Sequence, residues 1–229
     1  MLMSSKNYDL SQSIKTLFVS LVGMALGAKL CGYLTGIYRD IGLGNPITLD
    51  SVIDTGIVYY GGLLGLITTY YLCLQAKRCV LDVHSLDVLA VCFPLFHSIA
   101  RIGCFLSGCC YGKIYQGTLA INYTTIIEGN VDRNLRFPVQ LFESLFELAL
   151  FIYLLSLLHK KEWRLKKLLL RYLAIYSVGR FFLEFLRGDI RRGIICGVSF
   201  SQCISILIWI ALITYYLKRR RFKNTKGGS

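Results

Sequence analysis

The sequence predicts an all-α protein, a polytopic integral membrane helical bundle of about six transmembrane helices, and three observations support this fold class. The 229 residues are 55% hydrophobic and only 17% charged, and their mean hydropathy is +0.54, which argues against a soluble domain. Apolar stretches recur at close to the roughly 20 residues that cross a bilayer. Only three prolines are present, which suits long uninterrupted helices.

Six apolar stretches form the predicted spans of a single transmembrane domain, residues 1–229. They lie near residues 16–37, 55–76, 86–106, 138–158, 168–186 and 198–217, with an outer loop at 107–137. The first stretch is expected to remain as a helix, because its apolar core is long and no small-residue cleavage site precedes Lys29. In the outer loop, the alternating segment YQGTLAINYTT can form a short hairpin.

The distribution of basic residues predicts the orientation of the bundle. Lys and Arg concentrate in the connection after the fourth span and after the sixth span. If the N-terminus is cytoplasmic, most of the basic residues lie inside, as the positive-inside rule requires. Both termini are therefore predicted to be cytoplasmic in a multi-pass protein of the cell membrane. The excess of 26 basic over 13 acidic residues is then explained by topology and anionic lipid, and no nucleic acid partner is expected.

Ionisable residues inside the predicted spans are the first candidates for a functional site. An ionised side chain at the centre of a span costs about 3 kcal/mol on insertion scales, so such residues usually face a bundle interior or a water-filled cavity. The residues concerned are Lys29, Arg101, Glu143, Glu147, Arg180 and Glu184. Purely structural ion pairs seldom reach this number in one small bundle.

Helical periodicity aligns polar residues into stripes on three of the spans. The stripes are Tyr176, Arg180, Glu184 and Arg187 at i, i+4, i+8 and i+11; Gln140, Glu143 and Glu147 at i, i+3 and i+7; and Arg101 with Cys104 at i, i+3. The predicted topology brings all three to the outer side, where one cavity can collect them. A cationic cavity with tyrosines suits an anionic amphipathic ligand, such as a phospholipid. The alternative is a purely structural network, in which Arg180 pairs with Glu184, and Glu143 with Lys29 or Arg101.

Glycines in the segment YYGGLLG permit close approach of a neighbouring helix or a ligand. Helix packing is the favoured interpretation of Gly61, Gly62 and Gly65. Tyr60, beside them, either carries a hydroxyl group into the cavity or anchors the helix at the membrane interface.

Three of the nine cysteines lie in the turn CFLSGCCYG, whereas most of the others are scattered in or beside spans and fit packing. Cys104, Cys109 and Cys110 follow Arg101, and a nearby cation favours the thiolate form. A structural zinc site needs four ligands and no set of partners is visible, so neither a metal nor a cofactor is predicted. A disulfide across the turn and free thiols both stay open.

Together these motifs resemble the prolipoprotein diacylglyceryl transferase family, bacterial membrane enzymes that move diacylglyceryl from phosphatidylglycerol to the cysteine of a lipoprotein precursor. The matching blocks are ARIGCFLSGCCYG, LDVLAVCFP, FPVQLFE, YLAIYSVGRFFLEFLRGD, YYGGLLG and LGAKLCGYL. The first is similar to the family signature GRIGNFINGELYG, and YYGGLLG is similar to FHGGLIG. The family's first span has no counterpart here, which agrees with six spans rather than seven.

The resemblance implies roles for individual residues. The family pattern carries over to Arg101, Arg180 and Glu184 as catalytic residues, and to Tyr176, Gln140, Glu143, Gly103, Gly108 and Gly112 as substrate-binding residues. Tyr60, Cys104 and Cys109 are further catalytic candidates at positions where the family has other polar groups, and Lys29, a charge within the first span, is a further substrate-binding candidate. Arg101 and Arg180 would hold the phosphate of phosphatidylglycerol and stabilise the departing glycerol phosphate, while Glu184 would orient Arg180. The other partner would be a lipobox-like peptide, and the site would open toward the extracytoplasmic side.

Three positions depart from the family pattern. Cys104 replaces the signature asparagine, Cys109 replaces the signature glutamate, and Tyr60 replaces the histidine of the H-G-G motif. Tyr60 or a thiolate would then accept the proton. Two further hypotheses are acyl transfer through a thioester on Cys104 or Cys109, and a lipid-binding or transport protein without catalysis.

Overall fold

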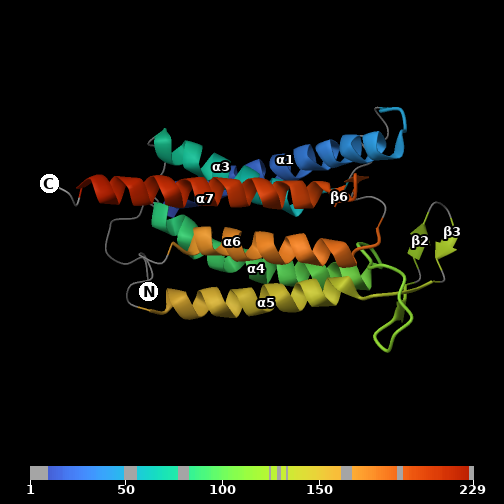
Figure 1. Cartoon of the computed structure of the whole chain (residues 1–229). Coiled ribbons are helices and arrows are strands. Elements are labelled where there is room, and N and C mark those ends of the chain that lie inside the picture. The colour runs from blue at the N-terminus through green and yellow to red at the C-terminus, as the bar shows by residue number, and fades with distance from the viewer. Residues whose placement is uncertain are drawn as a thin grey trace. The chain divides into compact units, whose positions relative to one another are not determined.

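The structure is a computed structural model that describes residues 10–48, 56–76, 83–123, 125–127, 130–132, 134–160, 167–189 and 193–226. Its helices are α1 (Leu10–Leu43), α3 (Tyr59–Gln75), α4 (Val83–Leu106), α5 (Val139–Leu158), α6 (Leu168–Leu183) and α7 (Phe200–Lys226), with a 3-10 turn η2 (Glu184–Leu186) after α6. Figure 1 shows these elements along the chain. The chain divides into two compact units: unit 1 is Met1–Leu89 with Arg191–Phe200, and unit 2 is Ala90–Ile190 with Ser201–Ser229.

The helices confirm the all-α membrane class. In the part of the chain that the structure describes, four segments are long and apolar enough to cross a membrane: Lys15–Leu43, Leu86–Leu106, Val139–Leu158 and Phe200–Arg220. Helices α3 and α6 have 17 and 16 residues, which at 1.5 Å per residue is about 25 Å, less than the roughly 30 Å hydrocarbon core. They are shorter than the predicted spans because residues 56–58 are not helical and the chain tightens into η2 after Leu183. The count of six spans stays a prediction.

In unit 1, α1 and α3 pack through glycines. Gly23 and Gly27 of α1 face Gly61 and Gly65 of α3, so closely that a Cβ atom on Gly61 would collide with the carbonyl group of Gly27. A Cβ atom on Gly62 would meet only side chains and a carbonyl of α1 at 3.2 Å or more. The close approach is the one that small residues permit between membrane helices. The packing interpretation of these glycines is therefore confirmed.

A short hairpin also belongs to unit 1. Strands β5 (Ile194–Ile195) and β6 (Val198–Ser199) pair antiparallel, and the hairpin contacts the end of α1. There the hydroxyl group of Tyr38 donates to the carbonyl oxygen of Val198 at 3.2 Å. This contact connects residues far apart in the sequence within the same unit.

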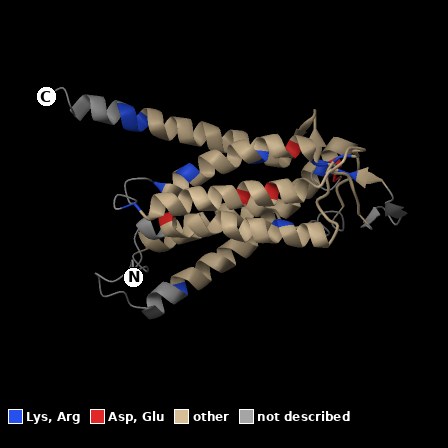
Figure 2. Cartoon of the chain, turned by 90° about the horizontal axis from the view of Figure 1, so that it is seen from below, with Lys and Arg blue, Asp and Glu red and all other residues tan. Residues whose placement is uncertain are grey.

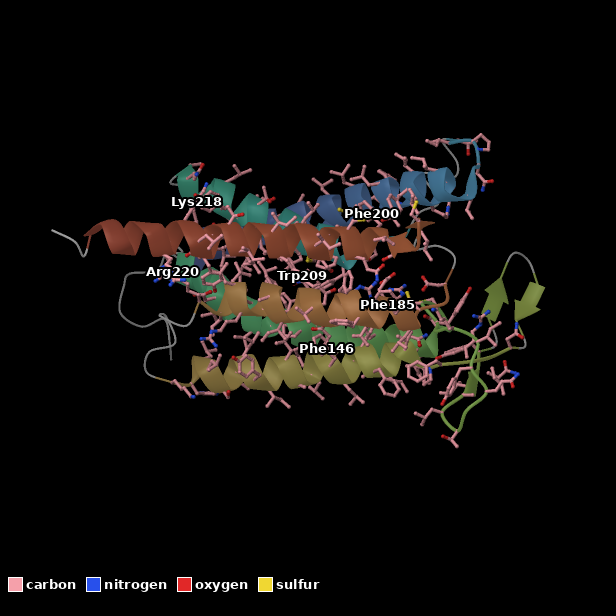
Figure 3. The ribbon with its side chains drawn as sticks, in the orientation of Figure 1. Phe146, Phe185, Phe200, Trp209, Lys218 and Arg220 are labelled. Atoms are coloured by element: carbon pink, nitrogen blue, oxygen red, sulfur yellow. The ribbon has the colours of Figure 1, made fainter. Side chains whose placement is uncertain are left out.

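Unit 2 contains most of α4 together with α5, α6 and α7. Helix α5 packs against α6 where the ring of Phe146 occupies the space that a side chain at Gly179 would need. Helix α7 contacts α6 through Trp209, whose Nε1 donates to the Ser177 hydroxyl oxygen at 2.9 Å. Figure 3 shows Trp209 in the middle of α7, with Lys218 and Arg220 toward its C-terminal end.

The described residues of the outer loop, 107–137, form two strand pairs. Strand β1 (Ile121–Asn122) pairs antiparallel with β4 (Leu135–Arg136), and β2 (Thr125–Ile127) pairs with β3 (Asn130–Asp132). The predicted hairpin within YQGTLAINYTT is therefore wrong. The backbone of this segment turns at residues 117–120, where the Ala120 amide donates to the Gly117 carbonyl at 2.9 Å, and its strands find their partners further along the chain.

Charged side chains are unevenly distributed along the helices. Figure 2 shows long tan stretches on the helices, with blue residues toward several helix ends and a few charged residues within the helical segments. The buried charged residues of unit 2 are Asp189, Arg101, Arg136, Glu143, Glu147, Arg180, Glu184 and Arg187. Because charge is expensive at membrane depth, these residues define the candidate site.

Candidate functional site

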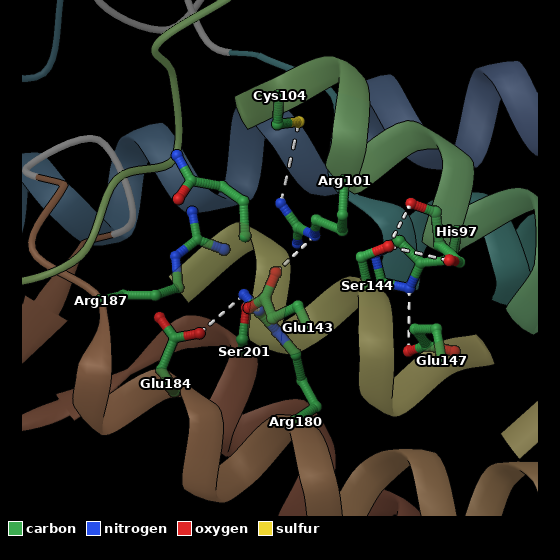
Figure 4. A network of polar contacts seen from close by, with 12 residues as sticks. His97, Arg101, Cys104, Glu143, Ser144, Glu147, Arg180, Glu184, Arg187 and Ser201 are labelled. Atoms are coloured by element: carbon green, nitrogen blue, oxygen red, sulfur yellow. Dashed lines mark hydrogen bonds and ion pairs between the residues drawn. The ribbon is translucent and has the colours of Figure 1, made fainter. Parts of the chain in front are cut away.

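The centre of the site is the carboxylate of Glu143 on α5, which binds two arginines. Its Oε2 lies 2.5 Å from Nε of Arg101 on α4, and its Oε1 lies 2.5 Å from Nη1 of Arg180 on α6. Figure 4 shows the three side chains converging from their helices. All three are buried. One anionic group therefore holds two cationic groups that come from different helices.

The network continues along α6 to Glu184. Nη2 of Arg180 lies 2.6 Å from Oε2 of Glu184, one helical turn away, and 3.4 Å from the hydroxyl oxygen of Ser201 at the start of α7. The spacing i, i+4 places both residues on one helix face. The stripes predicted from the sequence thus meet as expected, and the Arg180–Glu184 and Arg101–Glu143 pairings of the structural alternative are both present.

A second ion pair lies just beyond η2. Nε and Nη2 of Arg187 each donate to the carboxylate of Asp189 at 2.8 Å. Burial by itself lowers the pKa of Arg187, but Asp189 and Glu184 outweigh it and raise that pKa well above its ordinary value. The Arg187 guanidinium therefore stays charged beside the network, where Figure 4 places it.

Two further polar pairs connect α4 to α5. Nδ1 of His97 lies 3.1 Å from Oε1 of Glu147, and the hydroxyl groups of Ser98 and Ser144 are 2.9 Å apart. The imidazole ring of His97 packs edge-on against Tyr176 with centroids 5.6 Å apart. The sequence places Glu147 on a polar stripe but gives His97 no role. The serine pair carries no sequence signal, because serine is common in membrane helices.

Gln140 positions the signature turn that follows α4. Its Nε2 donates to the carbonyl oxygen of Cys109 at 2.7 Å, and its Oε1 accepts from the hydroxyl group of Tyr123 at 3.0 Å. Both ends of the amide are therefore used within the protein. The structure thus gives Gln140, predicted to bind substrate, a defined structural contact with the turn.

The backbone conformation and the available space explain two of the three signature glycines. Gly108 has φ +67°, a left-handed conformation that glycine adopts at little cost. A side chain at Gly112 would collide with the Phe137 carbonyl. By contrast, a Cβ atom at Gly103 would meet nothing within 4 Å. Gly108 and Gly112 are therefore explained by the turn, and Gly103 lies beside open space.

A pocket of about 300 Å³ lies between the end of α4 and β1. Its lining includes Phe105, Gly108 and Tyr123, so it adjoins the signature turn directly. Phe105 and Tyr123 contact each other edge to face, with ring centroids 5.9 Å apart. The pocket offers an aromatic surface next to the cysteines.

The cysteines of the turn lie close together as free thiols. The Sγ atoms of Cys104, Cys109 and Cys110 are all within 4.8 Å of one another, and the eight described cysteines include no disulfide. Nη1 of Arg101 lies 4.0 Å from Sγ of Cys104. The hydrogen bond from Cys104, opposed by burial and reinforced by Arg187 and Arg101, lowers the pKa of Cys110 below its ordinary value.

Two predicted site residues belong to unit 1. Tyr60 is fully buried in α3, and the ammonium group of Lys29 lies over the ring of Tyr33, 5.0 Å from its centroid. Of the two partners considered for Glu143 in the structural network, Lys29 and Arg101, the structure shows the pairing with Arg101. The catalytic role of Tyr60 and the substrate-binding role of Lys29 stay predictions.

Comparison with known proteins gives a consistent result. A family model described as prolipoprotein diacylglyceryl transferase matches residues 2–218. A phosphatidylglycerol–prolipoprotein diacylglyceryl transferase of Clostridium tetani is 33% identical over 218 residues, which cover 94% of this chain and 84% of the relative. A similarly named protein of Clostridium perfringens, numbered 2, is 32% identical over 214 residues, covering 93% of this chain and 81% of the relative.

Proposed function

The chain belongs to the prolipoprotein diacylglyceryl transferase family, and from this we propose that it transfers a diacylglyceryl group from phosphatidylglycerol to the cysteine of a prolipoprotein. The observation that carries the proposal is the convergence of Arg101 and Arg180 on the carboxylate of Glu143. Buried ionised side chains within membrane segments commonly mark a substrate or ion pathway, even where they pair with one another.

Guanidinium groups suit the phosphate of the lipid donor. Their planar fork matches two phosphate oxygens, which a lysine ammonium does not. In the proposed complex, Arg101 and Arg180 turn part of their hydrogen-bonding capacity from Glu143 to the phosphate. Glu184, 2.6 Å from Nη2 of Arg180, keeps that guanidinium oriented. The neighbouring Arg187 adds positive charge and is itself fixed by Asp189.

The proposed reaction is a displacement at the glycerol carbon that bears the phosphate. A bond forms between the acceptor sulfur and this carbon, and the bond from the carbon to the phosphate oxygen breaks. Negative charge develops on the departing glycerol phosphate, where preorganised cationic donors lower the barrier. The proton of the acceptor thiol passes to a base, for which Tyr60 and a thiolate of the signature turn are the candidates.

A second candidate function is acyl transfer through a cysteine. Free thiols at Cys104 and Cys109 support it, because a nucleophile must be unpaired. Attack by either thiol on the glycerol carbon would leave a stable thioether and end turnover, so a cysteine mechanism is productive only through an acyl thioester. Mass spectrometry with and without hydroxylamine distinguishes the two, since only a thioester adduct is released.

The site is proposed to open toward the extracytoplasmic side of the cell membrane. The basic residues support this orientation: the C-terminal part of α7 carries Lys218, Arg219 and Arg220, whereas the buried network lies toward the other end of that helix, near Ser201. Under the positive-inside rule the basic end is cytoplasmic. On this orientation the signature turn lies on the side where prolipoproteins emerge.

The test is transfer of label from labelled phosphatidylglycerol to a lipobox peptide in membranes that contain the protein. Wild-type protein is expected to label the peptide cysteine through a thioether, and Arg101→Gln is expected to lose roughly 100-fold or more of the rate. Arg171→Gln is the matched control, because Arg171 lies on the same helix as Arg180 and its Nη1 donates to the Tyr153 hydroxyl group at 2.9 Å, a contact separate from the ion pairs of Glu143. No transfer by the wild type beside a competent control enzyme would overturn the proposal.

A further inference from the structure

The three cysteines of the signature turn form a cluster that the proposed reaction does not require. Their Sγ atoms lie within 4.8 Å of one another, while thiolates on one tetrahedral ion with bonds of about 2.3 Å are about 3.8 Å apart. Metal binding therefore requires side-chain rotation only where two sulfur atoms lie farther apart than this. We propose that Cys104, Cys109 and Cys110 bind one thiophilic metal ion of the Zn²⁺ type, with water as the fourth ligand.

The backbone of the turn already brings the thiols to one side. The Cys109 amide donates to the carbonyl oxygen of Cys104 at 3.1 Å, which folds the chain back over the end of α4. Gly108 and Cys110 both have positive φ, +67° and +56°. For a residue with a side chain this conformation costs about 1–2 kcal/mol. The turn therefore holds Cys110 in an unfavourable backbone conformation that directs it toward Cys104, as the hydrogen bond between them requires.

The surroundings of the cluster suit a metal thiolate. Three thiolates with a divalent ion carry a net charge of −1, and the guanidinium group of Arg101, 4.0 Å from Sγ of Cys104, lies where it compensates that charge. The hydroxyl group of Ser107 lies 3.2 Å from the Cys104 carbonyl oxygen and 3.2 Å from Sγ of Cys109, so its one proton can donate to a ligated sulfur in place of the carbonyl oxygen. Hydrogen bonds of this kind orient and tune metal ligands.

The donor set defines the class of ion. Thiolate sulfur is soft and selects Zn²⁺, Cu⁺ and related ions over Mg²⁺ or Ca²⁺. Cys109 is exposed, so an ion can enter from outside the bundle, and water can complete the coordination there. Binding releases the remaining thiol protons to solvent.

A disulfide is the competing use of the same residues. It would join two of the three sulfurs and leave the third without a function. The structure instead has all three as free thiols, each Sγ atom within 4.8 Å of the other two, so no single pair is singled out. The test therefore includes disulfide formation as an outcome that contradicts the proposal.

The experiment titrates the reduced full-length protein in detergent with Cd²⁺, after anaerobic removal of the reductant. The readout is thiolate-to-cadmium charge-transfer absorption, followed by displacement with Zn²⁺ in competition with a chromophoric chelator. Wild-type protein is expected to bind one ion per chain. Cys109→Ser and Cys110→Ser are each expected to weaken binding at least tenfold. Cys92→Ser removes an exposed thiol from α4 outside the cluster and is expected to leave binding unchanged.

A second measurement needs no variant and so does not depend on folding of the serine mutants. Zn²⁺ is expected to protect the three cysteines of the turn from alkylation, mapped by peptide mass spectrometry, while Cys196, exposed in the β5–β6 hairpin, stays reactive. The proposal fails if Zn²⁺ gives no protection, if a triple serine variant with native helix content binds Cd²⁺ as tightly as wild type, or if the protein isolated without oxidant contains a disulfide within the turn.

Discussion

The two units hold their helices together in different ways. In unit 1, α1 and α3 meet at Gly23, Gly27, Gly61 and Gly65, so their backbones come into direct contact. In unit 2, α4, α5 and α6 meet around buried arginines and glutamates. Since this chain packs membrane helices well with glycine, the charges of unit 2 are not needed to bring helices together. Their expense at membrane depth points to a ligand.

The largest expected effect is on catalysis at Arg180. Arg180→Lys keeps a positive charge for Glu143 and Glu184 but removes the fork that matches phosphate. We expect label transfer to fall roughly 100- to 1,000-fold, and the thermal unfolding temperature, measured on the same sample, separates this loss from destabilisation by the lost contacts with Glu184 and Ser201. Arg171→Lys on the same helix is the control. If Arg180→Lys transfers label at the wild-type rate, Arg180 is a structural counter-ion, and the charges of unit 2 hold helices together just as the glycines of unit 1 do.

Much of this network can be predicted from the sequence, and the reason is helical periodicity. Residues spaced three or four apart must share a helix face, so the spacing alone aligns Arg180 with Glu184, and Gln140 with Glu143. The family resemblance then points to Arg101 and the turn. The predicted topology adds only that the three polar stripes lie toward the same side of the membrane.

The remaining features depend on contacts between residues far apart in the chain. Gln140 binding the Cys109 carbonyl and His97 meeting Glu147 are set by the separation and rotation of α4 and α5, which periodicity does not define. Hydropathy also overestimates the lengths of α3 and α6, because it marks apolar residues and not where a helix begins or ends. The clustering of the three thiols follows from positive φ angles at residues 108 and 110. A positive φ angle at a cysteine cannot be predicted from the sequence.

The glycine crossing of unit 1 gives the next largest effect. Gly61→Ala places a Cβ atom against the backbone carbonyl of Gly27, and two rigid helices must separate to admit it. Overpacking of this kind costs about 3 kcal/mol at the upper end of its range, which lowers the unfolding temperature by several degrees. Gly62→Ala is the control, since its Cβ atom would meet nothing closer than 3.2 Å. Equal unfolding temperatures for the two variants would contradict the close backbone packing.

The signature glycines extend the comparison into unit 2. Gly112→Ala collides with the Phe137 carbonyl, but it lies in a loop that can relax, so we expect a loss of about 2 kcal/mol in the free energy of unfolding. Gly103→Ala lies in α4 with nothing within 4 Å, and replacing a helical glycine should stabilise by about 0.5–1 kcal/mol. Denaturant titration in detergent measures both. A stable Gly103→Ala variant with slower label transfer is the result expected if substrate occupies the open space.

The smallest effect is expected for the serine pair, which tests what a polar but uncharged contact contributes to unit 2. Ser98 and Ser144 join α4 to α5, 2.9 Å apart, in the same interface as Arg101 and Glu143 but without charge. Hydrogen bonds between membrane helices average about 0.6 kcal/mol, so Ser144→Ala should lower the unfolding temperature only slightly and leave label transfer unchanged. If it abolished transfer at native stability, the polar groups of α5 would act as one unit, and the distinction between packing contacts and the arginine site would fail.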